Sequence, residues 1–322
     1  MGRDVLVVAG PTASGKSALA LALARHLGGT VINADAMQCY RDLHILTARP
    51  SAAETAEAPH ALYGVLDAAT PATAAWWRGA ALDAIAVAPG LPILCGGTGL
   101  YLRVLAEGIA PVPEVPEAAR AEARRLLAEL GAPGLHARLA AIDPETAARL
   151  RPNDSQRLAR AYEVATGTGH GLAHWQRQQA APPALRFSAI VLDPPVAELR
   201  AAITSRFHAM LEAGALEEVR ALLARGLDPA LPLLRAHGVP ELTDHLAGRA
   251  TLAEAAARAV AATARYTKRQ RTWWRHHEAA PGGRVLPIRA RIAAMTQLME
   301  REWPQILAFL DHMGLTAAQH RQ

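Results

Sequence analysis

Lysine is almost absent from this chain, since only two of its 34 basic residues, Lys16 and Lys268, are lysines. Arginine carries a planar fork of donors, whereas lysine places a compact charge on a flexible stem. A position that keeps lysine in such a sequence indicates a place where the compact ammonium fits better. Lys16 follows a glycine-rich segment and is therefore the first candidate for a ligand-binding residue.

Cysteine is equally scarce, and Cys39 and Cys95 show no paired spacing. This excludes a disulfide framework and a thiolate zinc site, and it suits a reducing compartment. No apolar run approaches the roughly 18 residues that a membrane span needs. Residues 1–4 lead directly into a strand pattern, which leaves no room for a signal peptide. We therefore expect a cytoplasmic protein without a membrane span.

Aromatic residues make up only 4% of the 322 residues, so any cluster of them is informative. A hydrophobic fraction of 51% supplies a sizeable core, and the length allows one or two domains. The formal net charge of +5 is compatible with a polyanionic partner without proving one. The thirteen histidines show no spacing typical of a metal site.

The segment Gly10–Ser17 matches the phosphate-binding loop pattern G-x-x-x-x-G-K-[ST]. A buried strand, Val5–Ala9, precedes it, and a leucine- and alanine-rich helix, Ser17–Leu27, follows it. In such a loop successive backbone N–H groups and the helix N-terminus converge on phosphate oxygens. Ser17 is the residue expected to bind magnesium if the ligand is a metal-bound polyphosphate.

Further strands are predicted at Thr30–Ala34, Leu91–Cys95 and Ala189–Asp193, with a helix at Ala72–Val87. Alternating strands and helices predict an α/β fold, namely a P-loop NTPase-like parallel sheet with helices on both faces. Ligands of such sheets bind at the carboxyl ends of the strands.

Polar residues follow several of these strands. Asp35 could act as a general base, bind a metal or cap the following turn. Thr98 lies in a glycine-rich turn, where it could reach a phosphate or a substrate or simply form the turn. Asp193 is followed by Pro194 and Pro195, which favours a turn or helix cap over a magnesium site.

The amino-acid composition changes from Ala110, where a proline-rich linker leads into an arginine-rich sequence with a helical pattern. We interpret residues 112–183 as an inserted all-helical domain and residues 1–111 with 184–290 as the P-loop-like core. Residues 291–322 are expected to form a helical C-terminal tail.

A late segment, residues 265–275, interleaves tryptophan, tyrosine and glutamine with cations. Cations that contact phosphates and rings that stack on bases are what recognition of single-stranded RNA requires. The alternative is a helix that buries Trp273 or Trp274. The earlier arginine clusters, at 120–125 and 149–160, could equally form solvated helix faces.

Together these motifs resemble the bacterial tRNA dimethylallyltransferases, also called isopentenyltransferases, from about residue 4 to about residue 290. The resemblance rests on the following segments: Gly10–Ser17, Ile32–Arg41, Leu46–Pro50, Pro59–His60, Gly96–Tyr101, Arg151–Arg160, Ser205–Leu211 and Lys268–Arg275. It implies transfer of a dimethylallyl group from dimethylallyl diphosphate to the exocyclic amine of the adenosine directly 3′ of the anticodon. It also implies Mg²⁺ as cofactor, tRNA as partner, and a nucleotide-binding (ATP-binding) type of loop reused for a prenyl diphosphate. A monomer is the default expectation.

The resemblance also implies roles for individual residues, with Asp35 as the general base and Thr98 at the reacting centre. The diphosphate-binding residues would be Gly10, Thr12, Ala13, Ser14, Gly15, Lys16, Ser17 and Arg206, of which Ser17 would also bind the metal. The tRNA-binding residues would be Asp35, Ala36, Met37, Gln38, Thr98, Arg120, Gln156, Arg157, Leu158, Ala159, Arg160, Arg235, Lys268, Arg269, Gln270, Arg271, Thr272, Trp273, Trp274 and Arg275.

The chain departs from the family pattern at a few positions. Ala36 replaces the usual serine, His44 and Leu46 replace an aspartate and a glycine, and Arg49 replaces a lysine. Two alternative functions remain open: a small-molecule or nucleotide kinase using the same loop and Asp35, and a non-catalytic RNA-binding protein that senses nucleotide.

Overall fold

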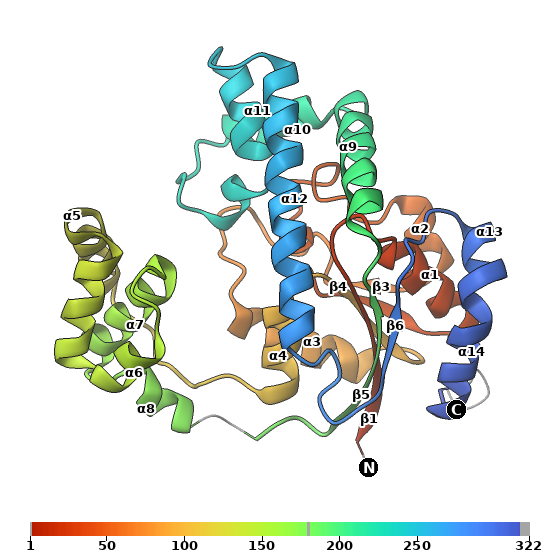
Figure 1. Cartoon of the computed structure of the whole chain (residues 1–322), viewed down its shortest axis with the longest axis horizontal. Coiled ribbons are helices and arrows are strands. Elements are labelled where there is room, and N and C mark those ends of the chain that lie inside the picture. The colour runs from red at the N-terminus through yellow and green to blue at the C-terminus, as the bar shows by residue number, and fades with distance from the viewer. Residues whose placement is uncertain (1, 179–180, 316–322) are drawn as a thin grey trace. The chain divides into compact units, whose positions relative to one another are not determined.

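A computed structural model describes residues 2–178 and 181–315 of the chain (Figure 1). In this part of the chain six parallel strands form one sheet in the order β3-β2-β4-β1-β5-β6. The strands are β1 (Arg3–Ala9), β2 (Thr30–Asn33), β3 (His60–Ala61), β4 (Pro92–Gly96), β5 (Leu185–Leu192) and β6 (Val285–Ile288). The predicted parallel α/β sheet is confirmed. The edge strands β3 and β6 were not predicted, because each is too short to show a hydrophobic pattern.

Both faces of the sheet are covered, which explains the continuous apolar runs of its strands. In β1, Val5 and Val7 belong to one buried cluster, whereas Leu6 and Val8 belong to another. This division follows from the alternation of side chains along a strand.

The helices follow the same division into two faces. The cluster around Val5 includes residues of α3 (Ala74–Val87), α4 (Gly99–Glu107), α9 (Val196–Glu212), α10 (Ala215–Ala224), α11 (Val239–Leu246) and α12 (Leu252–His276). The cluster around Leu6 includes residues of α1 (Lys16–Leu27) and α14 (Trp303–His312). A short helix, α2 (Ala52–Glu57), precedes β3. Figure 1 shows α9 and the long helix α12 side by side.

The end of the chain packs onto the sheet. After α13 (Met295–Gln297) and a π-helical turn, α14 buries Ile306 and Leu310 in the same cluster as Leu19 and Leu23 of α1. Through Leu315, the region predicted as a C-terminal tail thus shares a hydrophobic core with the sheet. Residues 316–322 of that prediction lie outside the described part.

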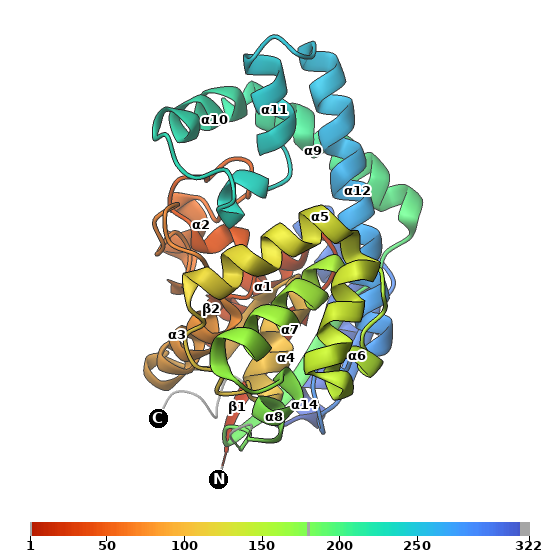
Figure 2. The same ribbon diagram turned by 90° about the vertical axis from the view of Figure 1, so that its left-hand side faces the viewer.

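The chain divides into two compact units, residues 1–106 with 184–322 and residues 107–183. The second unit is helical, and its core contains Leu126, Leu135, Leu139 and Leu158. Its helices are α5 (Glu117–Ile142), α6 (Pro144–Arg149), α7 (Ser155–Thr168) and α8 (Leu172–Arg177). Figure 2 shows α5 beside α7, and α5 bends at Gly131, whose φ is +67°.

No helix in the described ranges is long and apolar enough to cross a lipid bilayer.

Candidate active site

The phosphate-binding loop joins β1 to α1, and its backbone leaves the ordinary regions at two places. Ala13 has a φ of +67° and Gly15 has a φ of +91°, and both values belong to the left-handed region. A Cβ atom at position 15 would lie 2.1 Å from the carbonyl oxygen of Ile292, so glycine is required there. The glycine of the sequence motif therefore also makes room for a segment far along the chain.

Arg291 and Ile292, which follow β6 in the chain, form hydrogen bonds to the backbone of this loop. The N–H of Ile292 donates to the carbonyl of Ser14 at 3.0 Å, and Nε of Arg291 donates to the carbonyl of Ala13 at 3.0 Å. The Ser14 hydroxyl is buried and has no hydrogen-bond partner among the described residues. These contacts fix the positions of the backbone that the sequence motif identifies.

The carboxyl ends of β1, β2 and β4 lie side by side at the same edge of the sheet. In the sheet Ala9 pairs with Gly96, and Asn33 pairs with Cys95, so β1, β2 and β4 end together. The residues that follow these strands are therefore neighbours, as expected for a parallel sheet.

A pocket opens at these strand ends, and the sequence predicted part of its lining. It is formed by Thr12, Lys16, Asp35, Met37, Gln38, Leu46, Thr47, Ile203, Arg206, Phe207, Met210, Ala236, His237, Thr263 and Tyr266. Lys16, Asp35 and Arg206 are charged, whereas Ile203, Phe207 and Met210 are apolar. The structure thus brings the predicted base and three predicted diphosphate ligands, Thr12, Lys16 and Arg206, together beside an apolar wall.

The two cations of the pocket lie in a poorly solvated place. Burial lowers the pKa of Lys16, and the charges of Cys95 and Asp35 partly oppose this effect. Burial also lowers the pKa of Arg206, with Asp35 opposing and Arg291 reinforcing the change. Desolvated cations gain most from a nearby anion, so this end of the pocket favours a negatively charged ligand.

Asp35 is held by the turn that follows β2. Its Oδ1 accepts the N–H of Met37 at 3.0 Å, and its own N–H donates to Oδ1 of Asn33 at 2.8 Å. Thr98 Oγ1 accepts the N–H of Ala36 at 3.1 Å. Of the roles left open for Asp35, the turn cap is therefore present, and the carboxylate also lines the pocket.

Several pocket residues were not predicted from the sequence. Ile203, Phe207 and Met210 follow the i, i+4, i+7 spacing of one helix face, which could have identified the apolar wall. His237 and Tyr266 lie with their ring centroids 5.1 Å apart. Burial raises the pKa of Tyr266 to about 12, and burial lowers the pKa of His237.

The loop that contributes Leu46 and Thr47 is fixed through its backbone. The carboxylate of Glu218 on α10 accepts the N–H groups of His44, of Ile45 at 2.8 Å and of Leu46 at 3.0 Å. Gln38 Nε2 donates to the carbonyl of Thr47 at 2.9 Å. The unusual side chains at positions 44 and 46 therefore leave these contacts intact.

Helix α12 carries the late basic segment and presents two different faces. Lys268, Arg269 and Thr272 are exposed, as the prediction of a polyanion-binding face requires. Gln270, predicted among the tRNA contacts, is only 4% exposed and points into the protein. Trp274 packs against the core, as the alternative interpretation of the segment allowed.

Asp193 has a different role from the one expected. The residue before α9 is Pro195, and no side-chain cap is present there. The Asp193 carboxylate instead pairs with Arg271 and, at 3.8 Å, with Arg275 of α12. Of the two predicted roles, a turn or a helix cap, the side-chain cap is absent, and α12 supplies cations that the local sequence around Asp193 does not reveal.

The remaining predicted contacts differ in their exposure to solvent. Gln156, Arg157 and Arg160 of α7 are exposed, whereas Leu158 is fully buried in the core of the helical unit and is corrected to a packing residue. Ala159 and Arg120 are half-buried and Arg235 is exposed.

No cluster of three or more His, Cys, Asp or Glu side chains suited to a metal ion occurs in the described ranges. The exposed Ser17 follows Lys16 in the first turn of α1.

Comparison with known proteins identifies the family to which this chain is similar. The family described as IPP transferase matches residues 38–277, and the one described as isopentenyl transferase matches residues 3–61. The tRNA dimethylallyltransferase of Gluconobacter oxydans is 57% identical over 98% of this chain and 96% of its own length. That of Acidiphilium cryptum is 59% identical over 96% of this chain and 95% of its own length.

Among solved structures, the tRNA isopentenylpyrophosphate transferase of Bacillus halodurans superimposes with a TM-score of 0.66 and 29% identity. The superposition covers 97% of this chain and 98% of that structure. The family suggested by the sequence motifs is thus confirmed. The chain belongs to the tRNA dimethylallyltransferase family of prenyltransferases.

Proposed function

We propose that this chain transfers the dimethylallyl group of dimethylallyl diphosphate to N6 of the adenosine directly 3′ of the anticodon of tRNA. The observation that carries the proposal is the composition of one pocket, where Lys16, Arg206 and Asp35 face an apolar wall. An allylic diphosphate has the same two parts, a polyanion joined to a short hydrocarbon.

The diphosphate occupies the polar end, where the phosphate-binding loop, Lys16 and Arg206 surround it. Breaking the bond between the allylic carbon and oxygen moves an electron pair onto the departing diphosphate. Fixed cations at this place stabilise the charge that develops in the transition state.

The dimethylallyl group lies against Ile203, Phe207 and Met210, and the target adenine enters beside Asp35. The lone pair of N6 forms the new bond to the allylic carbon, and the N6 proton passes to the Asp35 carboxylate. Thr98 keeps Asp35 in place through the N–H of Ala36. Flipping the base is easiest from a single-stranded anticodon loop.

Mg²⁺ would be held by the Ser17 hydroxyl together with diphosphate oxygens. The residues present fit this ion, because Mg²⁺ in phosphate sites typically keeps several waters and uses few protein ligands. Its charge would neutralise part of the diphosphate charge. The buried, unpartnered hydroxyl of Ser14 is a further polar atom of the same loop.

We place the tRNA along the exposed cations of α12, with Lys268, Arg269 and Arg275 as phosphate contacts, and along Arg157 and Arg160 of the helical unit. We assign these tRNA contacts of the helical unit to the inserted domain that the linker composition predicts at residues 112–183. The enzyme acts as a monomer in the cytoplasm, where its tRNA substrate is found.

The test combines unmodified tRNA, dimethylallyl diphosphate and Mg²⁺ with the purified protein, followed by digestion and mass analysis of the nucleosides. We expect adenosine that is heavier by one dimethylallyl group, and none when Mg²⁺ is chelated. Consumption of ATP with a small acceptor, without prenylated adenosine, would support the kinase alternative. Binding of tRNA with no turnover of either compound would support a non-catalytic RNA-binding protein.

A further inference from the structure

Gln270 is one of two polar residues of the late basic segment that are almost fully buried, with 4% of its surface exposed; the other is Thr267, with 5%. Burying an amide is unfavourable unless its donors and acceptors find partners. Its Oε1 accepts the N–H of Thr12 at 2.9 Å and the Thr12 hydroxyl at 3.2 Å. Its Nε2 donates to the carbonyl of Gly97 at 3.1 Å. The amide is therefore engaged at both ends.

These partners belong to the active site. Thr12 is part of the phosphate-binding loop and lines the pocket, and Gly97 directly precedes Thr98. A Cβ atom at position 97 would lie 2.1 Å from Nε2 of Gln270, so the contact requires glycine there. One turn earlier on α12, Tyr266 also lines the pocket. Gln270 thus ties the loop after β1 to the turn after β4.

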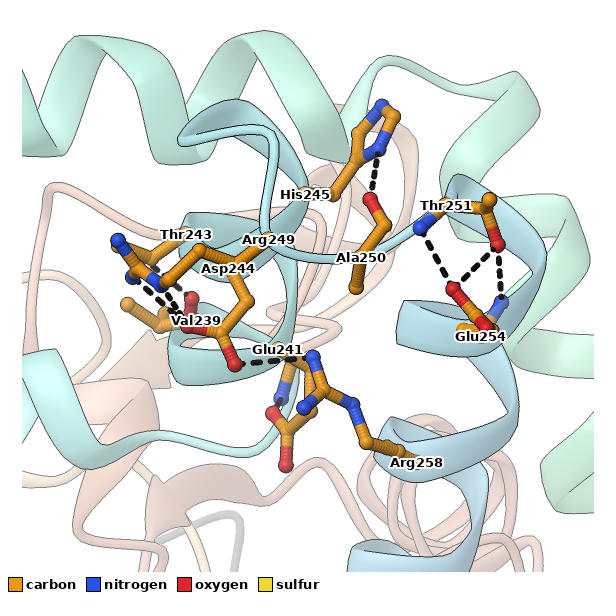
Figure 3. A network of polar contacts seen from close by, with 11 residues as sticks. Val239, Glu241, Thr243, Asp244, His245, Arg249, Ala250, Thr251, Glu254 and Arg258 are labelled. Carbon is orange, nitrogen blue, oxygen red and sulfur yellow. Dashed lines mark hydrogen bonds and ion pairs between the residues drawn. The ribbon is translucent and has the colours of Figure 1, made fainter.

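The opposite face of the same helix is exposed. Two residues in either direction along an α-helix correspond to about 200°, so Lys268 and Thr272 point away from Gln270. The helix is fixed at its start by a capping box between Thr251 and Glu254 and by the ion pair of Arg258 with Asp244 (Figure 3). The first two turns of α12 are therefore held by contacts within the helix and with α11.

We propose that Gln270 is a positioning residue that couples tRNA binding on α12 to diphosphate binding in the phosphate loop. This rests on the proposed function for the location of tRNA, but it assigns Gln270 to the loop instead of to the RNA. Binding of tRNA against Lys268 and Arg269 holds α12 in the arrangement in which Gln270 keeps Thr12 and Gly97 in place. The two substrates therefore bind more tightly together than separately, and by reciprocity each favours the other equally.

The experiment measures binding without catalysis, by titrating inorganic diphosphate with Mg²⁺ into the full chain by calorimetry, with and without saturating unmodified tRNA. For the wild-type chain we expect tRNA to tighten diphosphate binding by a factor of about five or more. For Gln270→Ala we expect diphosphate affinity about tenfold weaker and the effect of tRNA lost. Affinity for tRNA alone should change by less than about twofold. Gln270→Glu, which keeps the acceptor for Thr12 but loses the donor to Gly97, should lie between the two.

Thr267→Ala is the matched control. Thr267 is also buried, on the same helix, but its hydroxyl donates to the Thr263 carbonyl within that helix at 2.9 Å. This variant should keep the wild-type diphosphate affinity and the effect of tRNA on it.

Melting temperatures of both variants distinguish loss of the fold from loss of coupling, and Gln270→Asn replaces Gln270→Ala if the latter does not fold. Equal diphosphate affinities for Gln270→Ala and Thr267→Ala, or absence of any tRNA effect in the wild type, would overturn the proposal. Because no prenyl transfer is measured, these outcomes do not depend on the transfer reaction.

Discussion

Thr98 Oγ1 accepts the backbone N–H of Ala36 at 3.1 Å, although the two residues are 62 positions apart in the chain. This bond joins the turn after β4 to the turn after β2. Its consequence is that Asp35, which directly precedes Ala36, is held between two strand ends and lines the pocket. Residues whose rotamers are fixed by neighbours are what precise catalysis requires.

Asp35→Asn should abolish transfer without loosening the site. The asparagine oxygen can still accept the N–H of Met37, so the turn is preserved while the base is removed. Loss of a general base typically lowers the rate by a factor of about 10² to 10⁴. The measurement is single-turnover prenylation of tRNA beside a tRNA-binding titration, which should change by less than about twofold. A similar loss in binding and rate would contradict the separation of roles.

Lys268→Ala should weaken tRNA binding and reduce its dependence on salt. Each phosphate contact contributes about one unit to the slope of log affinity against log salt concentration. The matched control is Arg258→Ala, because Arg258 is exposed on the same helix but pairs with Asp244 at 2.9 Å (Figure 3). Titrations at several salt concentrations should show a smaller slope of log tRNA affinity against log salt concentration for Lys268→Ala but not for Arg258→Ala. Equal slopes in both variants would count against the proposed phosphate contact.

Leu310→Ala should destabilise the whole sheet unit. Leu310 is 1% exposed and shares a hydrophobic cluster with α1 and the sheet. Removing a buried leucine side chain typically costs about 2–5 kcal/mol of unfolding free energy. Met299→Ala, at a position 42% exposed in the same region, should change it by no more than about 0.5 kcal/mol. Urea unfolding followed by circular dichroism measures both, and an unchanged Leu310→Ala midpoint would mean that α14 is a separate appendage.

Both cysteines should be inert in the folded protein and should make stability fall at high pH. Burial raises the pKa of Cys39 to about 12 and that of Cys95 to about 11. A thiol in the unfolded chain titrates near about 8.5, so the folded state keeps these protons to higher pH. Their contribution to stability is complete below about pH 8.5 and is lost as the pH rises toward the folded-state pKa, about 11 for Cys95 and about 12 for Cys39.

A chromogenic disulfide reagent at about pH 8 tests this accessibility. The folded chain should show no fast reaction, and both thiols should react after denaturation. The midpoint of urea unfolding should decrease between about pH 9 and about pH 11, the folded-state pKa of Cys95. Rapid labelling of the native protein would show that one of the thiols is accessible.

Part of the candidate active site can be predicted from the amino-acid sequence alone. The segment Gly10–Ser17 is identified by its own residues, since glycine, lysine and serine at fixed spacing describe a local backbone shape. Asp35 and Thr98 follow apolar runs whose ends meet in any parallel sheet. Their convergence, and the α/β class itself, could therefore be predicted.

Other parts could not be predicted, because they depend on which face of a distant helix turns inward. The loop contacts of Arg291 and Glu218 involve single side chains outside any recognised motif. His237 and Tyr266 join the pocket from segments that the sequence analysis had assigned to tRNA contacts or left without a role. The ion pair of Asp193 was missed for the same reason, since its partner Arg271 is 78 positions away.

The two lysines illustrate the division. The amino-acid sequence alone identified the tRNA-modifying family and predicted that Lys16 binds phosphate-like anions, because both inferences depend on short, contiguous patterns. Only the tertiary structure decided that Gln270, two residues after Lys268, turns inward to Thr12 while Lys268 stays exposed. The physical reason is that packing against the sheet selects one face of α12 for burial, and composition leaves that choice open.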